Sequence, residues 1–407
     1  MSEVVLEENR ASTVHLSDDQ VSALEEIGRR MASRLEWWGA HCRADSAGTD
    51  TEATSVVSIA FRSNGAHLVK FRNVVGAVRL GDTQLKVVPK IPLNHFCYLM
   101  QKSDVSPRVG DHAIRVGSSE DLRELVCRWL LVEAERLLRL GLQRDYSEYD
   151  EELSEVRGTV QAIPTVLANL AGRAIVRCVY SDLDEDAAIN RLIKAGCVEV
   201  ALNPLLDDSQ RLRARRLVLA MGAVGPLRHS DRRFQATRLH SRYSRAIPLA
   251  KLVLAGRGAC LDHGYVSGTA FLLPTPGVIE SGLRNVLSEA LPTIDVKKRG
   301  LRLAEGRITL NPDLVIDGGH TVGDVKYKYF GGDWDRASFN QVVTFATGFQ
   351  AERAFIVGFR RKEDGSIPAP AKVGQVRVRK FAWVASDDVS PESSERRLKE
   401  EVSEWLG

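Results

Sequence analysis

The segment NPDLVIDGGHTVGDVKYKYF restricts the possible folds of this chain more than any other part of its sequence. Two β-rich runs flank Gly318-Gly319, and glycines accept the positive φ angles of a tight hairpin turn. Counting outward from this turn places Asp313 opposite Asp324, with β-carbons roughly 4.5–5.5 Å apart. Because side chains alternate along a strand, Lys326 emerges on the same face as both carboxylates.

Two opposed carboxylates repel each other and destabilise a hairpin unless a positive charge lies between them. Mg²⁺ supplies such a charge through one or two carboxylates while keeping several waters, and Mn²⁺ suits the same oxygen ligands. A lysine beside the metal can orient an attacking water and stabilise charge that develops on a phosphate. The spacing alone equally allows a plain turn, in which Asp313 caps a strand and Asp324 pairs with a lysine on a wet surface.

The segments on either side of the hairpin favour the metal interpretation. A predicted helix over 277–291 carries Glu280 among apolar residues, and a predicted helix over 334–349 carries Gln341. Taken singly, each of these two residues is also an ordinary solvent-facing helical side chain. Together with the hairpin they supply a third carboxylate and an amide near the two aspartates.

The last third of the chain has the element order of one α/β layer: helix, three strands in a meander, helix and strand. The patterns predict strands over 295–304, 308–317, 321–329 and 352–359, a further strand VRVRKFAW, and a closing helix after Ser390.

The rest of the chain predicts a multidomain α+β or α/β protein. Hydrophobic residues make up 44% of the 407 positions, enough to bury more than one core. Ser17 and Gln20 form a capping-box pattern that starts a helix near Asp18 and runs to Gly39, after a loose tail over 1–16. We predict four segments: a tail and helix (1–55), a small β domain (56–105), a mainly helical linker domain (106–265) and an α/β domain (266–407).

The linker domain carries ten arginines between Arg211 and Arg245, opposed there only by Asp231. Arginine forks onto phosphate oxygens and displaces counterions, so this stripe suits a nucleic-acid backbone. The alternative is a solvated helix face with ordinary ion pairs. The candidate DNA contacts are Arg211, Arg215, Arg232 and Arg233. In this domain, only residues 157–163 and 175–181 have a sequence pattern typical of strands.

The polar, acidic start of the chain lacks the features of a secretory signal, and no stretch holds eighteen consecutive apolar residues. We therefore expect a soluble cytoplasmic protein with no membrane contact. The six cysteines show no zinc-ligand spacing, so we expect them to be reduced and buried.

With these residues in view, the carboxy-terminal third resembles a PD-(D/E)XK nuclease, a restriction-endonuclease-like α/β core. The resemblance extends to the McrC family, the nuclease subunit of McrBC-type modification-dependent (type IV) restriction systems. It is carried by a Pro-Lys after the β segment, an Arg-Gly after the long helix, an Asn-Arg in the next helix, and Asp-x-Lys-Tyr-Lys, and it covers roughly residues 56–360.

The resemblance implies a DNA endonuclease that works with a McrB-like AAA+ GTPase, which recognises modified cytosine and translocates double-stranded DNA. It implies that residues 56–92 contact this motor. Asp313 and Asp324 are then metal ligands, with Glu280 as an auxiliary acid. Lys326 is the catalytic lysine and Gln341 an orienting residue. The chain has no G-x-x-x-x-G-K-[ST] loop of its own, which is consistent with a separate motor.

Two other functions stay open at this point. The chain could be a non-catalytic adaptor that only activates a ring ATPase or GTPase and keeps the nuclease fold as a scaffold. It could also be a free-standing metal-dependent nuclease that needs no motor and uses the arginine stripe for backbone contacts.

Overall fold

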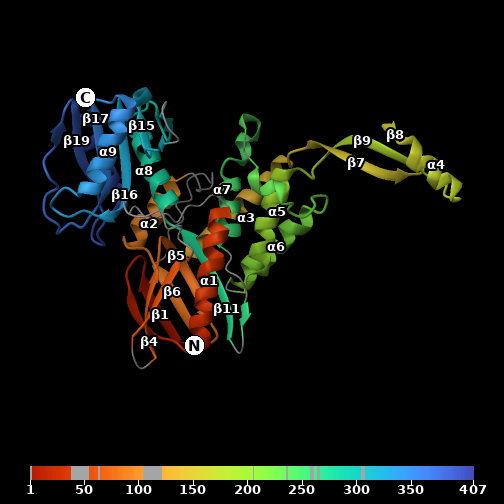
Figure 1. Ribbon diagram of the computed structural model, residues 1–407, viewed down its shortest axis with the longest axis horizontal. Helices are drawn as coiled ribbons and strands as arrows, with labels where there is room; N and C mark the ends of the chain where they lie inside the picture. Colours follow the sequence, from red (N-terminus) through yellow and green to blue (C-terminus); the bar gives the residue numbers. More distant parts are fainter. Residues whose placement is uncertain are drawn as a thin grey trace. The chain divides into compact units, whose positions relative to one another are not determined.

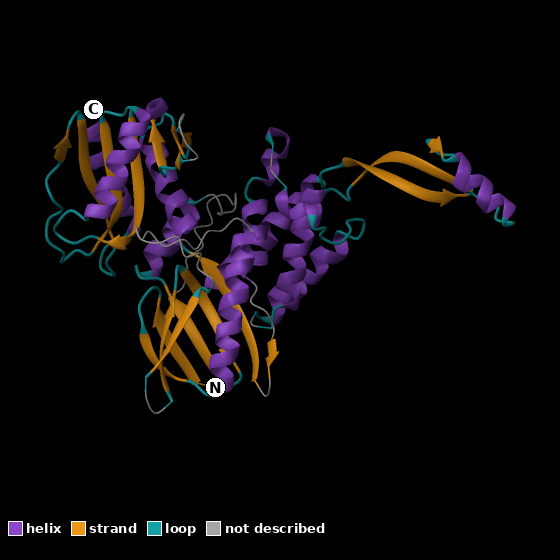
Figure 2. Cartoon of the chain, viewed as in Figure 1, coloured by secondary structure: helices purple, strands orange, loops and turns teal. Residues whose placement is uncertain are grey.

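The computed structural model describes residues 2–37, 55–62, 65–103, 122–204, 206–234, 237–256, 261–263, 266–303 and 308–407. The chain separates into two compact units, and Figures 1 and 2 show the helices and strands of both. One unit is residues 126–254, and the other joins residues 1–125 to residues 255–407. In the described part of the chain, no helix combines the length and the apolar character that spanning a membrane requires.

In its described residues, the amino-terminal part of the discontinuous unit holds two sheets and two helices. The five-stranded sheet has the order β1-β6-β5-β11-β10, and the three-stranded sheet the order β2-β4-β3. The elements are β1 (Ser2–Glu7), β2 (Ser12–His15), α1 (Asp18–Trp37), β3 (Val57–Phe61), β4 (Ala66–Phe71), β5 (Val74–Leu80), β6 (Thr83–Val88), α2 (Leu93–Lys102), β10 (Leu261–His263) and β11 (Val266–Pro274). The strands expected between 56 and 90 are thus confirmed.

The capping box at the start of α1 is confirmed. The backbone N–H of Ser17 donates to Gln20 Oε1 over 3.0 Å, and that of Gln20 donates to Ser17 Oγ over 3.3 Å. The helix then buries Leu24, Ile27 and Met31 against the sheets, which is the face that its helical period predicts.

The expectation of a loose tail over residues 1–16 is wrong. Those residues form β1, which pairs in parallel with β6, and β2, which pairs with β4. A local pattern could not reveal this, because the partners of both strands lie more than 50 residues downstream. The segment boundary expected at 265/266 also falls inside this sheet, since β11 pairs antiparallel with β5. Gly76 allows that close approach, because a β-carbon there would lie 2.1 Å from the carbonyl oxygen of Phe271.

The carboxy-terminal part is a six-stranded mixed sheet of order β12-β15-β16-β17-β19-β18. Helix α9 packs on one face, and Trp405 of α10 packs on the other against Phe355 and Phe381. The elements are α8 (Pro276–Ala290), β12 (Val296–Lys297), β13 (Leu301–Arg302), β14 (Thr309–Leu310), β15 (Leu314–Ile316), β16 (Thr321–Tyr329), α9 (Arg336–Phe349), β17 (Arg353–Arg360), β18 (Ala371–Val373), β19 (Val376–Val384) and α10 (Pro391–Leu406).

Two strands expected as continuous are interrupted. The predicted strand 295–304 becomes β12 and β13, and the predicted strand 308–317 becomes β14 and β15. β13 pairs only with β14, outside the main sheet. The second interruption falls at Asn311-Pro312-Asp313, where the proline lacks the N–H that a ladder needs.

The continuous unit contains a group of helices and an arm. The helices are α3 (Leu122–Leu140), α5 (Ala188–Leu202), α6 (Asp208–Ala220) and α7 (Ala246–Gly256), with 3-10 turns η1 (Ser230–Arg233) and η2 (Arg238–Tyr243). The arm is the long two-stranded ribbon of β7 (Asp145–Leu153) and β9 (Val176–Asp184), with β8 (Thr159–Val160) and α4 (Ala162–Leu170) at its far end (Figure 1).

The arm corrects the expectation of only two strand-like runs in this region. Strand β7 was not expected, because its sequence DYSEYDEEL is rich in acidic residues that disfavour strands. Cross-strand partners compensate: Arg177 lies 2.8 Å from Asp150, Arg173 lies 2.8 Å from Glu152, and two tyrosine rings stack. The run expected as a strand over 157–163 is mostly β8 and the start of α4.

Candidate active site

The hairpin of β15 and β16 has the register that the sequence count requires. Leu314 pairs with Gly323, so one further step places Asp313 opposite Asp324. The turn has positive φ at Asp317 as well as at the two glycines, and the N–H of His320 donates to the carbonyl of Asp317 over 3.1 Å. Gly318-Gly319 thus makes the turn that fixes which residues meet across the hairpin.

The Asp313 carboxylate reaches across the hairpin to the neighbouring strand. Its Oδ2 accepts a hydrogen bond from the backbone N–H of Val325 over 3.1 Å, and the residue is 8% exposed. The bond holds this side chain beside Asp324, the residue that precedes Val325. Asp313 therefore does more than cap a strand.

Asp324, Lys326 and Gln341 are joined by one chain of contacts, in which Asp324 and Lys326 are buried and Gln341 is exposed. Lys326 Nζ lies 2.8 Å from Asp324 Oδ2 and donates to Gln341 Oε1 over 2.9 Å. Asp324 and Lys326 are 3% and 2% exposed, so their ion pair is not the wet-surface pair that the spacing also allowed. The sheet thus places Gln341 of α9 over the face that carries Lys326.

Glu280 and Asp313 meet through a lysine that the sequence patterns did not single out. Lys298 Nζ lies 2.8 Å from Glu280 Oε2 and 3.0 Å from Asp313 Oδ1. Burial raises the pKa of the Glu280 carboxyl to about 7, and the nearby Asp313 carboxylate adds to the rise. Burial alone would lower the pKa of Lys298, but Asp313 and Glu280 raise it.

The position of Lys298 had one signal in the sequence, the basic run Lys297-Lys298-Arg299 just ahead of the hairpin. The run alone does not say which member turns inward. Lys297 pairs with Asp295, whereas Lys298 supplies the positive charge that two neighbouring carboxylates require. Each is about half exposed, so neither is fixed by burial.

The donor set suits a small divalent cation. No three histidine, cysteine, aspartate or glutamate side chains form a metal cluster among the residues that the structure describes. Mg²⁺ needs only one or two carboxylates because it retains water ligands. Asp313 is held in place by a backbone bond, and the Lys298 ammonium already demonstrates that a cation is accommodated between Asp313 and Glu280.

The arginine stripe of the continuous unit is largely committed to internal partners. Arg211 pairs with Asp208, and Arg213 makes two bonds to Glu135, of 2.5 and 2.7 Å. Arg215 is exposed, and Arg232 is partly buried. The side chain of Arg233 lies outside the described residues. This pattern agrees with the alternative of ordinary ion pairs for part of the stripe and leaves Arg215 accessible.

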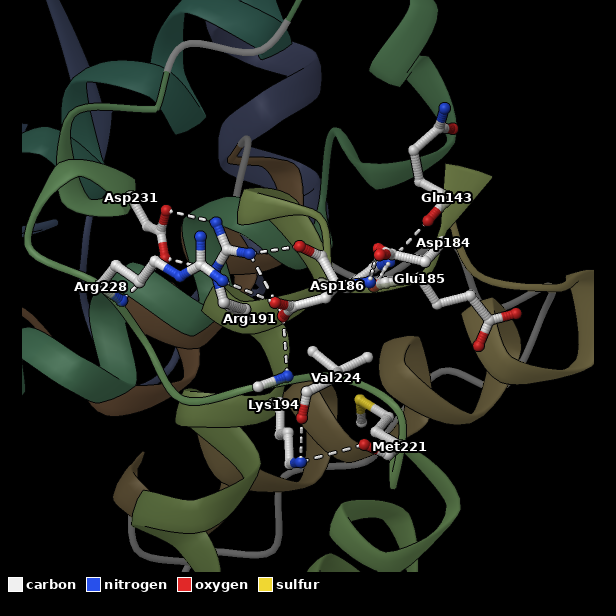
Figure 3. Close-up of polar contacts among 12 residues, drawn as sticks. Gln143, Asp184, Glu185, Asp186, Arg191, Lys194, Met221, Val224, Arg228 and Asp231 are labelled. Atoms are coloured by element: carbon white, nitrogen blue, oxygen red, sulfur yellow. Dashed lines mark hydrogen bonds and ion pairs between the residues drawn. The ribbon is translucent and has the colours of Figure 1, made fainter. Parts of the chain in front are cut away.

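The Asn-Arg motif of α5 has a structural role (Figure 3). Arg191 makes bonds of 2.7 and 2.9 Å to the two carboxylate oxygens of Asp231, and it also pairs with Asp186 over 3.2 Å. Arg228 donates to the other oxygen of Asp186 over 2.8 Å. These ion pairs join α5 and the residues just ahead of it to η1 and to Arg228, which precedes η1. Asp231 is the one acidic residue between Arg211 and Arg245, and it pairs with Arg191, which lies outside the stripe.

Four of the six cysteines lie in described regions. Cys97, Cys127, Cys178 and Cys197 are all buried, as expected. Cys42 and Cys260 lie outside the described residues.

The end of the arm exposes apolar side chains that the sequence patterns did not single out. Four large side chains of α4 are more than half exposed: Ile163 (76%), Val166 (55%), Leu167 (62%) and Leu170 (81%). Gly158, from the Arg-Gly motif, lets the chain fold back closely there, because a β-carbon would lie 2.4 Å from the carbonyl oxygen of Val179. The available signal was the apolar run AIPTVLANL directly after a strand.

Comparisons with known proteins agree with this architecture. The McrC component in the refined half-complex of Thermococcus gammatolerans McrB AAA+ hexamers with bound McrC, from a tetradecameric assembly, superposes with a TM-score of 0.59 at 17% identity. The match covers 98% of this chain and 100% of that chain. The cryo-EM structure of the Thermococcus gammatolerans McrBC complex gives a TM-score of 0.47 at 17% identity, over 86% and 99% of the two chains. No curated protein sequence matches the chain.

A family model for the McrBC 5-methylcytosine restriction system component matches residues 69–357, which is most of the 407-residue chain. That span includes the Pro-Lys, Arg-Gly, Asn-Arg and Asp-x-Lys-Tyr-Lys motifs. The chain therefore belongs to the McrC family of McrBC restriction system components.

Proposed function

We propose that this chain is the DNA endonuclease subunit of a McrBC-like restriction system in anti-phage defence. It hydrolyses phosphodiester bonds of double-stranded, modified DNA with Mg²⁺, and it is activated by a McrB-like AAA+ GTPase that it stimulates in turn. The observation that carries the proposal is the buried ion pair of Asp324 and Lys326, which lies beside Asp313 and in contact with Gln341. Burying an ion pair is costly, so its presence here supports a chemical task, which we propose to be hydrolysis of the PD-(D/E)XK type.

Each residue of the site has a distinct part in the proposed hydrolysis. Asp313 and Asp324 would hold Mg²⁺, with Glu280 as an auxiliary acid, and the metal would supply a Lewis acid at the phosphate. The Lys326 ammonium, kept in place by Gln341, stabilises the negative charge that grows on the phosphate oxygens as water attacks. The P–O bond to one sugar breaks, which leaves a phosphate monoester and a hydroxyl.

The test is cleavage of DNA by the reconstituted pair of this chain and its motor. In Asp313→Ala and Lys326→Ala we expect cleavage to fall by roughly 10²–10³-fold or more. Binding to the motor and stimulation of its GTPase should stay intact, which shows that the variants fold. The matched control is Lys372→Ala, at an exposed position of edge strand β18, which should cleave normally. Variants of the site that still cut DNA would refute the assignment.

The same preparation separates the two other functions. A non-catalytic adaptor would stimulate the motor but show no Mg²⁺ or Mn²⁺ affinity that depends on Asp324. A free-standing nuclease would degrade DNA with Mn²⁺ in the absence of any partner. For the proposed subunit we expect metal affinity that Asp324→Asn weakens, and little cleavage until the motor is added.

The arm offers the surface that best suits the motor. In residues 56–92 the strands bury most of their large apolar side chains, and Phe61 is the large apolar residue exposed in the described part of that range. At the end of the arm, α4 exposes four such side chains on a nine-residue helix. Large exposed apolar patches mark protein contacts. We therefore propose that α4 makes the main ring contact, in addition to residues 56–92, which the family resemblance implies.

A further inference from the structure

The strand that carries Lys326 is irregular at that residue. Strand β16 pairs with β17 up to Val325, which lies opposite Val357, and pairs again at Tyr329, opposite Phe359. The three residues from Lys326 to Lys328 thus lie opposite the single residue Gly358. In such a bulge the ladder does not fix the direction of a side chain, and bulges beside active sites commonly re-aim one. Something other than strand pairing must hold Lys326 toward Asp324.

Tyr327, the next residue along the strand, points to the other face and is 7% exposed. Its ring packs edge-on against Phe359, with centroids 5.7 Å apart. The ammonium of Lys90 lies 3.9 Å from the centre of the same ring, which is cation–π contact. Lys90 is the lysine of the Pro-Lys motif that follows β6. Lys90, just after strand β6 of the amino-terminal sheet, therefore contacts the bulge through the ring of Tyr327.

Glu8 completes this buried cluster behind the bulge. Its backbone N–H continues the pairing of β1 with β6, by donating to the carbonyl of Val88 over 2.9 Å. Its side chain is 1% exposed, accepts a hydrogen bond from the hydroxyl of Thr275, and attracts the charge of Lys90. The Glu8 carboxyl also faces the Tyr327 hydroxyl, and burial together with this nearby acid raises the pKa of Tyr327 well above its usual value. Glu8, Lys90 and Tyr327 therefore form one interacting cluster behind the bulge.

We propose that Tyr327 is a positioning residue that Lys90 and Glu8 hold from behind, so that the bulge of β16 presents Lys326 to Asp324 and Gln341. The amino-terminal sheet and the candidate active site are then joined by side chains from the ends of β1, β6 and β11. The inference deepens the proposed nuclease function and rests on it for its activity readout. A second readout does not depend on activity.

The test compares Tyr327→Leu and Lys90→Met in the full-length chain with two matched controls. Tyr329→Leu changes a tyrosine of the same strand outside the bulge, and Lys86→Met changes a lysine of β6 whose cross-strand neighbours are Val5 and Ala77. We expect kcat for motor-activated DNA cleavage to fall roughly tenfold in the two test variants, because a shift of about 1 Å in a catalytic group can cost up to about 10²-fold. The KM for DNA should not change.

Two further variants distinguish positioning from general destabilisation. Tyr327→Phe keeps the ring over which Lys90 lies and should restore most of kcat. The double variant Lys90→Met/Tyr327→Leu should lose little more than either single variant, because residues in one network act non-additively. Controls that lose as much kcat as the test variants, or a loss confined to KM, would overturn the proposal.

Amide hydrogen exchange of the peptide spanning residues 321–330 supplies the readout that needs no activity. Exchange at the bulge should rise in Lys90→Met and Tyr327→Leu and stay unchanged in Lys86→Met. If the wild-type pair fails to cut DNA, the proposed function fails, and the exchange experiment still decides the positioning role. Unchanged exchange in both test variants would overturn it.

Discussion

Two antiparallel hairpins of this chain distribute polar and apolar side chains in opposite ways. In β15–β16, Asp324 and Lys326 are 3% and 2% exposed, whereas at the end of the arm Ile163 and Leu170 are 76% and 81% exposed. Both arrangements are unfavourable in an isolated chain, since one buries charge and the other exposes large apolar surface. We infer that each hairpin is adapted to a ligand outside the chain, which is a charged ligand in the first case and a protein surface in the second.

The largest expected effect separates stability from function in β15–β16. Lys326→Met removes the ammonium 2.8 Å from the buried Asp324 carboxylate, so the free energy of unfolding should fall by about 3–5 kcal/mol. Adding Asp324→Leu should recover most of that loss, while cleavage stays roughly 10³-fold below the wild type. Urea unfolding and single-turnover cleavage measure the two quantities. If the double variant is as unstable as the single variant, the ion pair stabilises the fold. The contrast drawn between the two hairpins would then be wrong.

The next effect concerns the buried acid behind the hairpin. Burial raises the pKa of the Glu8 carboxyl from its ordinary 4.5 to about 7, against the opposing attraction of Lys90 and the contacts of Thr275 and Tyr327. A raised pKa means that the folded state binds the proton more tightly. Its stabilising contribution is therefore complete below pH 4.5 and is lost as the pH rises through 7. The total is on the order of 3 kcal/mol.

Glu8→Gln should flatten this part of the pH dependence. The measurement is the Tm of the full chain at pH 5 and pH 8, with Glu7→Gln as the control, because Glu7 is a neighbouring acid that pairs with Arg10 near the surface. The difference between the two Tm values should shrink in Glu8→Gln and persist in Glu7→Gln. An equal slope in Glu8→Gln and the wild type would count against a buried neutral acid at this position.

A smaller effect tests the exposed apolar side chains of α4 at the end of the arm. Replacing Ile163 and Leu167 of α4 by aspartate should lower stimulation of the motor GTPase by roughly tenfold or more, since buried apolar anchors dominate protein interfaces. Stability should change by no more than about 0.5 kcal/mol, because both side chains are already in solvent. Leu219→Asp is the control, at a leucine of α6 that is 78% exposed. Equal losses at both places would mean that the arm has no special role.

The smallest effect concerns the cation in the candidate site. Lys298→Met removes an ammonium that competes with Mg²⁺ for Asp313 and Glu280, so Mg²⁺ affinity should rise by roughly two- to tenfold. Lys297→Met, which removes the partner of Asp295, should leave it unchanged. Calorimetric titration of the full chain with Mg²⁺ alone checks both. A weaker affinity in Lys298→Met would show that this lysine organises the carboxylates.

The two hairpins also differ in how much of their structure can be predicted from the sequence. The register of β15–β16 follows from a local turn and a period of two, so the residue order alone brings Asp313, Asp324 and Lys326 to one face. The position of Gln341 can be predicted as well, because a helix that follows a strand packs back onto a face of the sheet. Information within about twenty residues suffices for each.

The features that the sequence patterns miss depend on partners distant along the chain. Strand β1 is stabilised by β6, and the acidic β7 by Arg177 of β9 and by Arg173 just ahead of β9, so neither shows a strand pattern of its own. Lys298 lies between Glu280 and Asp313 because of the path that the chain takes after β12, and not because of its spacing. The cluster of Glu8, Lys90 and Tyr327 joins three segments that no local pattern connects.

The pairing of β11 with β5 has a consequence for synthesis of the protein. Residues 126–254 leave the ribosome after β5 and before β11, so the continuous unit has the chance to fold first. Until residue 274 emerges, the edge of β5 that β11 will cover presents unpaired backbone groups, which is the kind of edge that invites wrong pairing between nascent chains. The delay also means that the candidate active site, farther along the chain, is completed last, after the rest of the chain has been made.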